Sequence, residues 1–312
     1  MNITEYIHTP VLSSELLQHL KIRLDGFYID CTFGRGGHSR AILRHLAEKG
    51  RLLAIDKDPA AIAAAGEELR DEPRITLVHG PYTIMKQLIE AQGKMGQVDG
   101  IIFDLGVSSP QLDDPARGFS FQSDGMLDMR MDTTKGITAT KWLNCAKETE
   151  ITKVLQHYGE ERYARRISRA IIKARSENPL RTTKQLVQLI SETVPTKEKD
   201  KHPATRTFQA IRIFINNELN ELRMALEQTI DILNIGGRLL VISFHSLEDR
   251  LVKRFMRNES RGDNFPPEIP VTHELIKPRL KIIGKAIYPS REEISKNPRA
   301  RSAIMRIAER VA

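Results

Sequence analysis

Three aspartates that each end a short apolar run are the residues whose type and spacing most clearly suggest chemistry. The runs 27–30, 51–56 and 98–104 end in Asp30, Asp56 and Asp104. Apolar runs of this length predict buried strands. The carboxyl ends of parallel strands converge on the ligand crevice of an open α/β sheet. One such acid alone is more often a helix cap or a solvated charge, but three together predict a binding site.

A glycine-rich turn with Gly34, Gly36 and Gly37 follows Asp30, and a helical pattern opens at Ser39. Strand, tight turn and helix predict the first unit of a nucleotide-binding fold, where glycines let the backbone approach a ligand. Dinucleotide sites run such a strand directly into the turn, whose amides meet a pyrophosphate. Here a carboxylate stands where that anion would approach. A cationic ligand, such as the ammonium group of S-adenosylmethionine, fits Asp30 better.

Two further residues extend this site. Asp56 follows Gly36 by 20 residues, the separation at which an acid meets ribose hydroxyls in α/β nucleotide sites. A third apolar run, 75–78, leads into a turn that carries Tyr82, an aromatic residue that could pack near an adenine.

Length, charge and cysteine content limit the class of protein. A chain of 312 residues can bury a sizeable core and hold two domains. Two cysteines make no disulfide framework, and we see neither a signal peptide nor a membrane-spanning run, so we expect a cytoplasmic protein. The net charge of +8 and the pI of about 9.4 favour a polyanionic partner. The nine histidines lack metal-ligand spacing, so we predict no metal.

The sheet resumes late, with a turn at 233–237 and a strand at 238–244. An apolar stripe at helical spacing precedes it and predicts one long helix packed on the sheet. The stripe consists of Ile211, Ile215, Leu219, Leu222, Leu226, Ile230 and Leu233. The segments 280–287 and 301–308 predict a final antiparallel pair. Five parallel strands followed by such a pair are typical of Rossmann-like methyltransferases, whereas a dinucleotide dehydrogenase more often ends with a sixth parallel strand.

Asp104 and Arg238 lie 134 positions apart, far more than one crossover helix needs. We therefore predict a methyltransferase domain over 1–112 and 204–312 and an inserted helical domain over 113–203. Helical periodicity marks 151–158, 162–174 and 183–193. The segment 150–184 holds nine Lys or Arg residues and four acids, which favours contact with nucleic-acid phosphates over an ordinary solvated face. The candidate contacts are Arg162, Arg165, Arg166 and Arg169.

Several longer runs give the chain a specific resemblance to one family. They are His8-Thr-Pro-Val-Leu, Asp30-Cys-Thr-Phe-Gly-Arg-Gly-Gly-His-Ser, Asp104-Leu-Gly-Val-Ser-Ser-Pro-Gln-Leu-Asp-Asp, Arg117-Gly-Phe-Ser-Phe, Leu127-Asp-Met-Arg-Met-Asp, Tyr158-Gly-Glu-Glu-Arg, Lys201-His-Pro-Ala-Thr-Arg-Thr-Phe-Gln-Ala-Ile-Arg, Ser243-Phe-His-Ser-Leu-Glu-Asp-Arg and Asn297-Pro-Arg-Ala-Arg-Ser. From about residue 8 to 310, the chain resembles the bacterial 16S ribosomal RNA cytosine-N4 methyltransferases, the MraW family.

The resemblance implies a Rossmann-like α/β sheet with an inserted helical domain. It also implies methyl transfer from S-adenosylmethionine to the exocyclic N4 of a cytidine in the decoding centre (P site) of 16S rRNA, in the small ribosomal subunit. A methyltransferase for another nucleic acid or a protein is the alternative. By the resemblance, cofactor contacts fall on Gly36, Gly37, His38, Asp56, Tyr82, Asp104 and Gln111. His38 and Gln111 come from the resemblance alone; Asp30 and Gly34 come only from the residue pattern.

The chemistry of an amine acceptor suggests catalytic residues. The N4 lone pair is delocalised into the cytosine ring, so hydrogen-bond acceptors on the amine would localise it and help to remove a proton. Asp104 is the candidate for orienting the amine or the cofactor. His245 is a second candidate, for a substrate contact or base, with a structural loop histidine as an equal alternative. Carbon-5 methylation would need a thiol nucleophile, but Cys31 lies in the cofactor turn, and we expect Cys145 to be buried and structural.

Overall fold

The computed structural model describes residues 10–195, 202–262 and 277–312. It forms two compact units, one of residues 1–106 with 219–312 and one of residues 107–218. The second unit is longer at both ends than the predicted insert of 113–203. Leu112 and Phe208 explain the difference, because both pack with the hydrophobic core of the second unit. Residues 8 and 201, which begin two of the family runs, lie outside the described ranges.

The first unit is built on a seven-stranded sheet in the order β3-β2-β1-β4-β5-β7-β6. The strands are β1 (Phe27–Asp30), β2 (Arg51–Asp56), β3 (Ile75–His79), β4 (Val98–Asp104), β5 (Leu233–Ser243), β6 (Leu280–Ile282) and β7 (Ile304–Arg310). The first five are parallel, and β7 runs antiparallel to both β5 and β6. The predicted mostly parallel sheet with a final antiparallel pair is confirmed.

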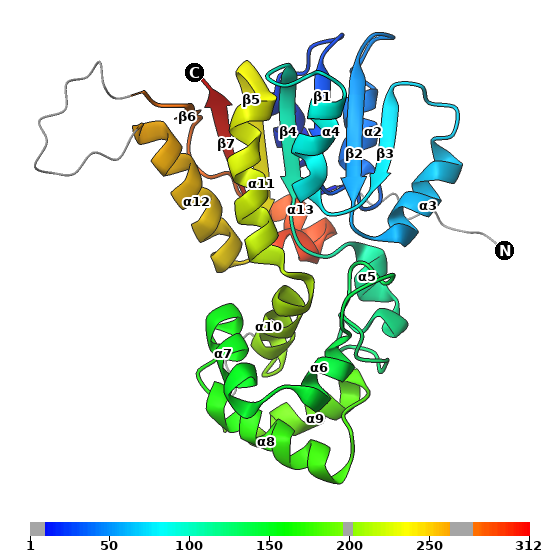
Figure 1. Cartoon of the computed structure of the whole chain (residues 1–312), viewed down its shortest axis with the longest axis vertical. Helices are drawn as coiled ribbons and strands as arrows, with labels where there is room; N and C mark the ends of the chain where they lie inside the picture. Colours follow the sequence, from blue (N-terminus) through cyan, green and yellow to red (C-terminus); the bar gives the residue numbers. More distant parts are fainter. Residues whose placement is uncertain (1–9, 196–201, 263–276) are drawn as a thin grey trace, which may run out of the picture. The chain divides into compact units, whose positions relative to one another are not determined.

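Helices cover both faces of this sheet. They are α1 (Ser13–Leu20), α2 (Gly37–Leu43), α3 (Pro59–Glu68), η1 (Tyr82–Ile84), α4 (Met85–Ala91), α11 (Glu218–Ile232), α12 (Ser246–Arg261), α13 (Arg291–Lys296) and η4 (Pro298–Ser302). Side chains alternate between faces along each strand: Ile29 and Phe103 join the core with α4, α11 and α12, whereas Tyr28 and Ile102 pack with α1 and α2. Figure 1 shows α4, α11 and α12 across one face.

The apolar stripe predicted as one long helix forms two. α10 (Thr205–Asn216) is capped by Asn217, whose φ of 53° is left-handed, and α11 follows. Asn is one of the few residues that tolerates this conformation. Ile211 consequently packs in the core of the second unit, while Leu222 packs in that of the first. The predicted turn at 233–237 is an irregularity inside β5, where the pairing with β4 shifts register.

The second unit is mainly helical. It contains α5 (Ser109–Asp113), η2 (Pro115–Arg117), α6 (Ala139–Cys145), α7 (Glu148–Gly159), α8 (Ala164–Glu177), α9 (Thr183–Thr193) and α10. The three periodic segments predicted here correspond to α7, α8 and α9. Their buried faces surround Trp142, whose indole Nε1–H donates to Glu150 at 2.7 Å. Across the described ranges, every helix is too short or too polar to cross a membrane.

Candidate functional site

The three aspartates end neighbouring strands, because β2, β1 and β4 are adjacent in the sheet. Parallel pairing sets Asp30 beside Ala54 of β2 and Ile102 of β4. Asp56 and Asp104 therefore lie on either side of Asp30 at the carboxyl edge of the sheet, as the sequence predicts. The three carboxylates nevertheless differ in exposure and in hydrogen-bond partners.

Asp30 is buried, with 1% of its surface exposed. Its Oδ2 accepts the Ser39 hydroxyl at 2.6 Å, and its Oδ1 accepts the Thr32 N–H at 3.1 Å. Burial raises the pKa of Asp30, and the Ser39 bond offsets part of that rise. These bonds join the strand end to the turn and to α2. Direct contact with a cationic ligand, which we expected of Asp30, is disfavoured because its carboxylate is buried and bonded internally.

The glycine turn requires glycine for reasons internal to the protein. Gly34 and Gly36 have φ values of 55° and 70°, which favour glycine. A Cβ on Gly36 would lie 2.4 Å from Cζ of Phe33, and one on Gly37 would lie 3.0 Å from Cγ of Pro10. We predicted these glycines from the approach of a ligand; in the structure, backbone conformation and packing already demand Gly36.

Asp56 is the last residue of β2, is half-buried, and bonds to the glycine turn that follows β1. Its Oδ2 accepts the Gly34 N–H at 2.6 Å, and its Oδ1 accepts the Asp58 N–H at 2.7 Å. Burial raises the pKa of Asp56 to about 6, against the opposing effect of those two hydrogen bonds. A carboxylate has about four acceptor positions, so Asp56 retains lone pairs for ribose hydroxyls.

His38 and Asp104 form a close imidazole–carboxylate pair. His38 Nε2 lies 3.4 Å from Asp104 Oδ2; the His38 side chain is 5% exposed and that of Asp104 is 25% exposed. Burial lowers the pKa of His38. The carboxylates of Asp104 and Asp30 together raise that pKa by more than burial lowers it, so the net shift is upward. The Asp104 N–H donates to Thr32 Oγ1 at 2.6 Å. The pair is positioned at the carboxyl end of β4.

Tyr82 lies in η1, just after β3. Its ring contacts Phe103 of β4 edge-on, with 5.5 Å between centroids and an interplanar angle of 83°. This contact fixes a half-buried aromatic ring in the first unit. A cofactor contact through Tyr82 stays a prediction.

Two other predicted site residues cap helices. Gln111 is 4% exposed, and its Oε1 accepts the Ser108 N–H at 2.9 Å in a capping box of α5, within the second unit. His245 is the N-cap of α12: its Nδ1 accepts the Glu248 N–H at 3.4 Å, and Glu248 Oε1 lies 3.1 Å from its Nε2. Capping accounts for both side chains structurally, and their predicted contacts to cofactor and substrate stay predictions.

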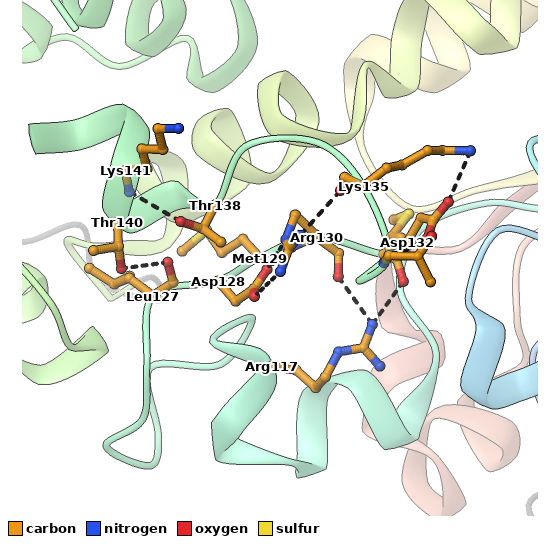
Figure 2. Close-up of polar contacts among 12 residues, drawn as sticks. Arg117, Leu127, Asp128, Met129, Arg130, Asp132, Lys135, Thr138, Thr140 and Lys141 are labelled. Carbon is orange, nitrogen blue, oxygen red and sulfur yellow. Dashed lines mark hydrogen bonds and ion pairs between the residues drawn. The ribbon is translucent and has the colours of Figure 1, made fainter. Parts of the chain in front are cut away.

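In the second unit, the family runs that begin at Arg117 and Leu127 lie together (Figure 2). Arg117 Nη2 donates to the carbonyls of Arg130 and Met131, at 3.1 and 2.9 Å. The Met129 N–H donates to the Arg117 carbonyl at 2.9 Å. Met129 is buried and has a φ of 60°, rare for a residue other than glycine. Such strain persists where surrounding contacts impose it, often at functional sites.

Charged side chains hold the same loop (Figure 2). Asp128 accepts both Nε and Nη2 of Arg130 at 2.8 Å. Burial alone would raise the pKa of Asp132, but bonds from Thr134 and Lys135 lower it to about 2. Asp132 therefore stays ionised at neutral pH. We did not predict this network, although the Asp-Met-Arg-Met-Asp spacing, with acids two residues either side of Arg130, is the signal that would have indicated it.

Helix α8 carries most of the predicted phosphate-binding cations. It begins at Ala164, so Arg162 lies in the preceding turn and not on the helix. The three exposed candidates on the helix are Arg165, Arg166 and Arg169. Arg169 Nε lies 3.4 Å from Glu148 Oε1, while Arg165 and Arg166 form no ion pair with another described residue. Arg175 differs, because its Nη1 donates to two backbone carbonyls at the end of α6.

The family model of the MraW methylases matches residues 5–311. The chain belongs to the MraW methylase family.

Solved structures with a similar fold include two proposed methylases and one named methylase. A proposed rRNA methylase of Clostridium thermocellum is 12% identical, with 96% of this chain and 95% of that chain covered and a TM-score of 0.46. An rRNA methylase of Streptococcus thermophilus is 11% identical, with both chains covered completely and a TM-score of 0.43. A proposed methyltransferase of Streptococcus mutans, in complex with SAH, is 12% identical, with 96% and 95% covered and a TM-score of 0.41.

S-adenosylmethionine is the methyl donor of this MraW-family protein, and the carboxyl edge fits it. Asp104 Oδ1 is buried and accepts no hydrogen bond from any residue in the described ranges. Buried polar atoms in proteins are normally satisfied, so this acceptor suits a donor on a bound molecule. Asp56 retains lone pairs for hydroxyls. The residues that would hold the cofactor are thus Asp56, Asp104 and the turn between Gly34 and His38.

The two cysteines have opposite environments. Cys31 is buried, with its Sγ 3.8 Å from Met85 Sδ, and Cys145 is exposed. The expectation that Cys145 is buried is wrong: it is the last residue of α6, and its neighbours Trp142 and Leu143 occupy the buried face instead. Burial raises the pKa of the Cys31 thiol well above its usual value. The environment of Cys31 therefore disfavours a thiolate.

Proposed function

We propose that this protein methylates the exocyclic N4 of a cytidine in the decoding centre of 16S rRNA, within the small ribosomal subunit. The whole-length match to the MraW methylases and the family runs quoted above support this proposal. A ribosomal substrate also accounts for the net charge of +8. A cytoplasmic location follows from such a substrate.

The observation that carries the proposal is the Asp104–His38 pair at the end of β4. When bound, S-adenosylmethionine supplies a methyl group on a positively charged sulfur, which an aligned nucleophile can attack. The Asp104 carboxylate accepts an N–H of the cytosine amine, which localises the nitrogen lone pair. His38 Nε2 lies 3.4 Å from the other oxygen, Asp104 Oδ2, and the buried imidazole positions that carboxylate. The proton released by the amine then passes to Asp104.

The environment of Cys31 favours N4 over carbon-5 methylation. A carbon-5 enzyme forms a bond from a thiolate to ring carbon 6. Cys31 is buried against Met85 and its pKa is raised well above the usual value, so it is a neutral thiol at pH 7. We propose the exocyclic nitrogen as the acceptor, since it needs no protein nucleophile.

Access to the N4 atom requires the cytidine to leave its stack, because structured RNA hides that edge of the base. Contacts to flanking phosphates must hold the strand while the base is displaced. We assign this task to the exposed arginines of α8 together with Arg162.

Mass spectrometry of nucleosides from 16S rRNA, treated with and without the protein and S-adenosylmethionine, tests the proposal. We expect N4-methylcytidine at one decoding-centre position. A matched reaction with 23S rRNA controls for charge-driven, unspecific binding. A 5-methylcytidine product would contradict the assignment of the acceptor. Methylation of 23S rRNA, DNA or a protein in preference to 16S rRNA would favour the alternative substrate classes.

A further inference from the structure

The first unit carries a row of cations on α12 that the proposed site does not use. All five members are exposed: Arg250, Lys253, Arg254, Arg257 and Arg261. At 100° per residue they fall within an arc of roughly 100°, and at 1.5 Å per residue they extend over about 16 Å. The row is therefore one continuous positive stripe along the helix, hereafter the α12 row.

The three acids of α12 contact groups outside this row. Glu248 belongs to the capping box at the helix start. Asp249 accepts Nε and Nη2 of Arg306 at 2.6 and 2.9 Å, and Glu259 Oε2 lies 2.7 Å from Arg279 Nε. Like charges three and four residues apart destabilise a helix. A stripe of them becomes favourable when an anionic partner lies along it.

The opposite face of α12 indicates what kind of partner this is. Val252 and Met256 are buried in the core of the first unit, and Leu251 and Phe255 pack against it. The exposed residues of the helix are therefore all charged or polar, whereas helices that bind membrane surfaces insert an apolar face. A partner helix in a groove would need the same apolar anchors. A polyanion contacted through its phosphates fits α12 best.

The position of α12 relates the row to the reaction. The helix follows β5 directly, and β5 is parallel to β4 and adjacent to it. Its first turn therefore lies at the same edge of the sheet as Asp104, and the row runs from that edge along the unit. Figure 1 shows α12 beside α11 on one face of the sheet.

We propose that the α12 row is a second phosphate-binding surface, which holds the rRNA strand that flanks the target cytidine. This inference rests on the proposed function and deepens it: the methyltransferase unit itself, and not only the helical unit, would bind the RNA backbone. Cations contribute to such binding by releasing counterions, each phosphate contact adding about 0.7–0.9 to the slope of log affinity against log salt.

Removal of three charges tests this. In the row variant Lys253→Gln, Arg254→Gln and Arg257→Gln are combined, and in the matched control Arg44→Gln, Lys49→Gln and Arg70→Gln are combined. The control removes the same charge from exposed positions in the turns between α2 and β2 and between α3 and β3 of the first unit. Binding to a 16S rRNA transcript is measured at several salt concentrations, with calorimetry of S-adenosylmethionine binding and thermal melting for both proteins.

We expect the row variant to bind the transcript at least tenfold more weakly at 0.1 M salt and to lose about 2 from the salt slope. The control should change affinity by less than about threefold, and cofactor affinity should be unchanged in both. Equal RNA affinity and equal slope for row variant and wild type would overturn the inference.

Two further measurements separate the inference from its alternatives. Co-sedimentation with phosphatidylglycerol vesicles tests a membrane role: row-dependent vesicle binding with unchanged RNA binding would overturn the inference in favour of a lipid surface. The methylation assay separates the proposed function. If the wild type fails to methylate 16S rRNA but its RNA binding still depends on the row, the proposed function fails and the phosphate-binding surface stands.

Discussion

The carboxyl edge of the sheet and the exposed arginines of α8 differ in how their side chains are held. At the edge, Asp30 and Asp56 accept hydrogen bonds from their own turn, and His38 is buried beside Asp104. On α8, Arg165 and Arg166 extend into solvent and form no ion pair with other described residues. The edge has fixed geometry and few exposed atoms, whereas the helix has charge and little fixed geometry.

This difference matches the roles that we propose for the two regions. A reacting centre must be held within a fraction of an ångström, which requires side chains locked by their neighbours. Phosphates are recognised by charge density, which flexible cations on a surface supply without exact placement. Substitutions at the edge should therefore cause large losses of cofactor binding or methylation. Substitutions on α8 should weaken RNA binding gradually and to an extent that depends on salt.

The largest effect is expected for Asp104→Asn. It preserves shape but removes the charge that pairs with His38 and that, in the proposed mechanism, accepts the amine N–H. We expect single-turnover methylation of 16S rRNA to slow by about 10²- to 10⁴-fold, with RNA affinity within about threefold of the wild type. A rate within threefold of the wild type would show that the edge does not act through Asp104.

Gly36→Val should weaken cofactor binding by about a hundredfold or more. Its φ of 70° strains a β-branched residue, and a Cβ there would meet Phe33 at 2.4 Å. Gly66→Val is the matched control, because a Cβ at Gly66 of α3 meets no atom within 4 Å. Calorimetry reports cofactor affinity and melting reports folding. Undiminished binding by a folded Gly36→Val protein would mean that the turn is not at the cofactor.

Asp56 should give cofactor binding a pH dependence. Burial raises its pKa to about 6, and ribose hydroxyls bind its ionised form. Affinity for S-adenosylmethionine should fall by up to about tenfold per unit as the pH drops below 6. Asp56→Asn should bind about 10- to 100-fold more weakly, without this dependence between pH 5 and 7. Calorimetry between pH 5 and 7 measures both the affinity and its pH dependence. The same pH dependence in the variant would exclude Asp56 as the origin of that dependence.

The pKa of Asp56 also predicts how the free protein responds to pH. The folded pKa lies above the value of about 3.9 for an unfolded chain. The folded state therefore binds more protons between these values, and this group lowers stability as the pH rises from about 4 to 6. Chemical denaturation at pH 4.5 and 7 gives the free energy of unfolding of the wild type and of Asp56→Asn. An equal change of this free energy with pH in both proteins would contradict a raised pKa of Asp56.

Charge reversal on α8 should have a moderate, graded effect. Arg165→Glu with Arg169→Glu should weaken 16S rRNA binding by about tenfold at 0.1 M salt and flatten its salt dependence. Cofactor affinity should stay the same. Lys141→Glu with Lys147→Glu, two exposed positions in the same unit, is the control. Because Arg169 pairs with Glu148, melting curves must accompany the assay. Wild-type methylation of 30S subunits over a range of salt would mean that another surface binds the RNA.

The smallest effect is expected for the cysteines. Cys31→Ser with Cys145→Ser should keep methylation within about threefold of the wild type, because N4 transfer needs no thiol. Cys31→Ala controls for the cost of placing a hydroxyl in the buried site of Cys31. Complete loss of activity in a stable double variant that still binds the cofactor would indicate a thiol mechanism.

The sequence by itself determined the mostly parallel sheet with its final antiparallel pair, and the strand ends that carry the candidate site. Apolar runs that end in Asp30, Asp56 and Asp104 predict strands, and parallel pairing then places those ends together. Long periodic segments likewise predicted α7, α8 and α9. These features are local: the period of apolar residues, together with glycine and aspartate at strand ends, encodes them within about ten residues of chain.

Only the tertiary structure decided which of the predicted groups are bonded internally and which keep an acceptor unbonded by the described residues. Asp30 and Asp104 each end an apolar run in the sequence. In the structure the Asp30 carboxylate is bonded to Ser39 and Thr32, whereas Asp104 Oδ1 accepts no hydrogen bond from the described residues. The stripe from Ile211 to Leu233 reads as one helix, yet a left-handed Asn217 divides it between two cores. The exposure of a side chain and its hydrogen-bond partners depend on residues distant in the chain, which only packing brings together.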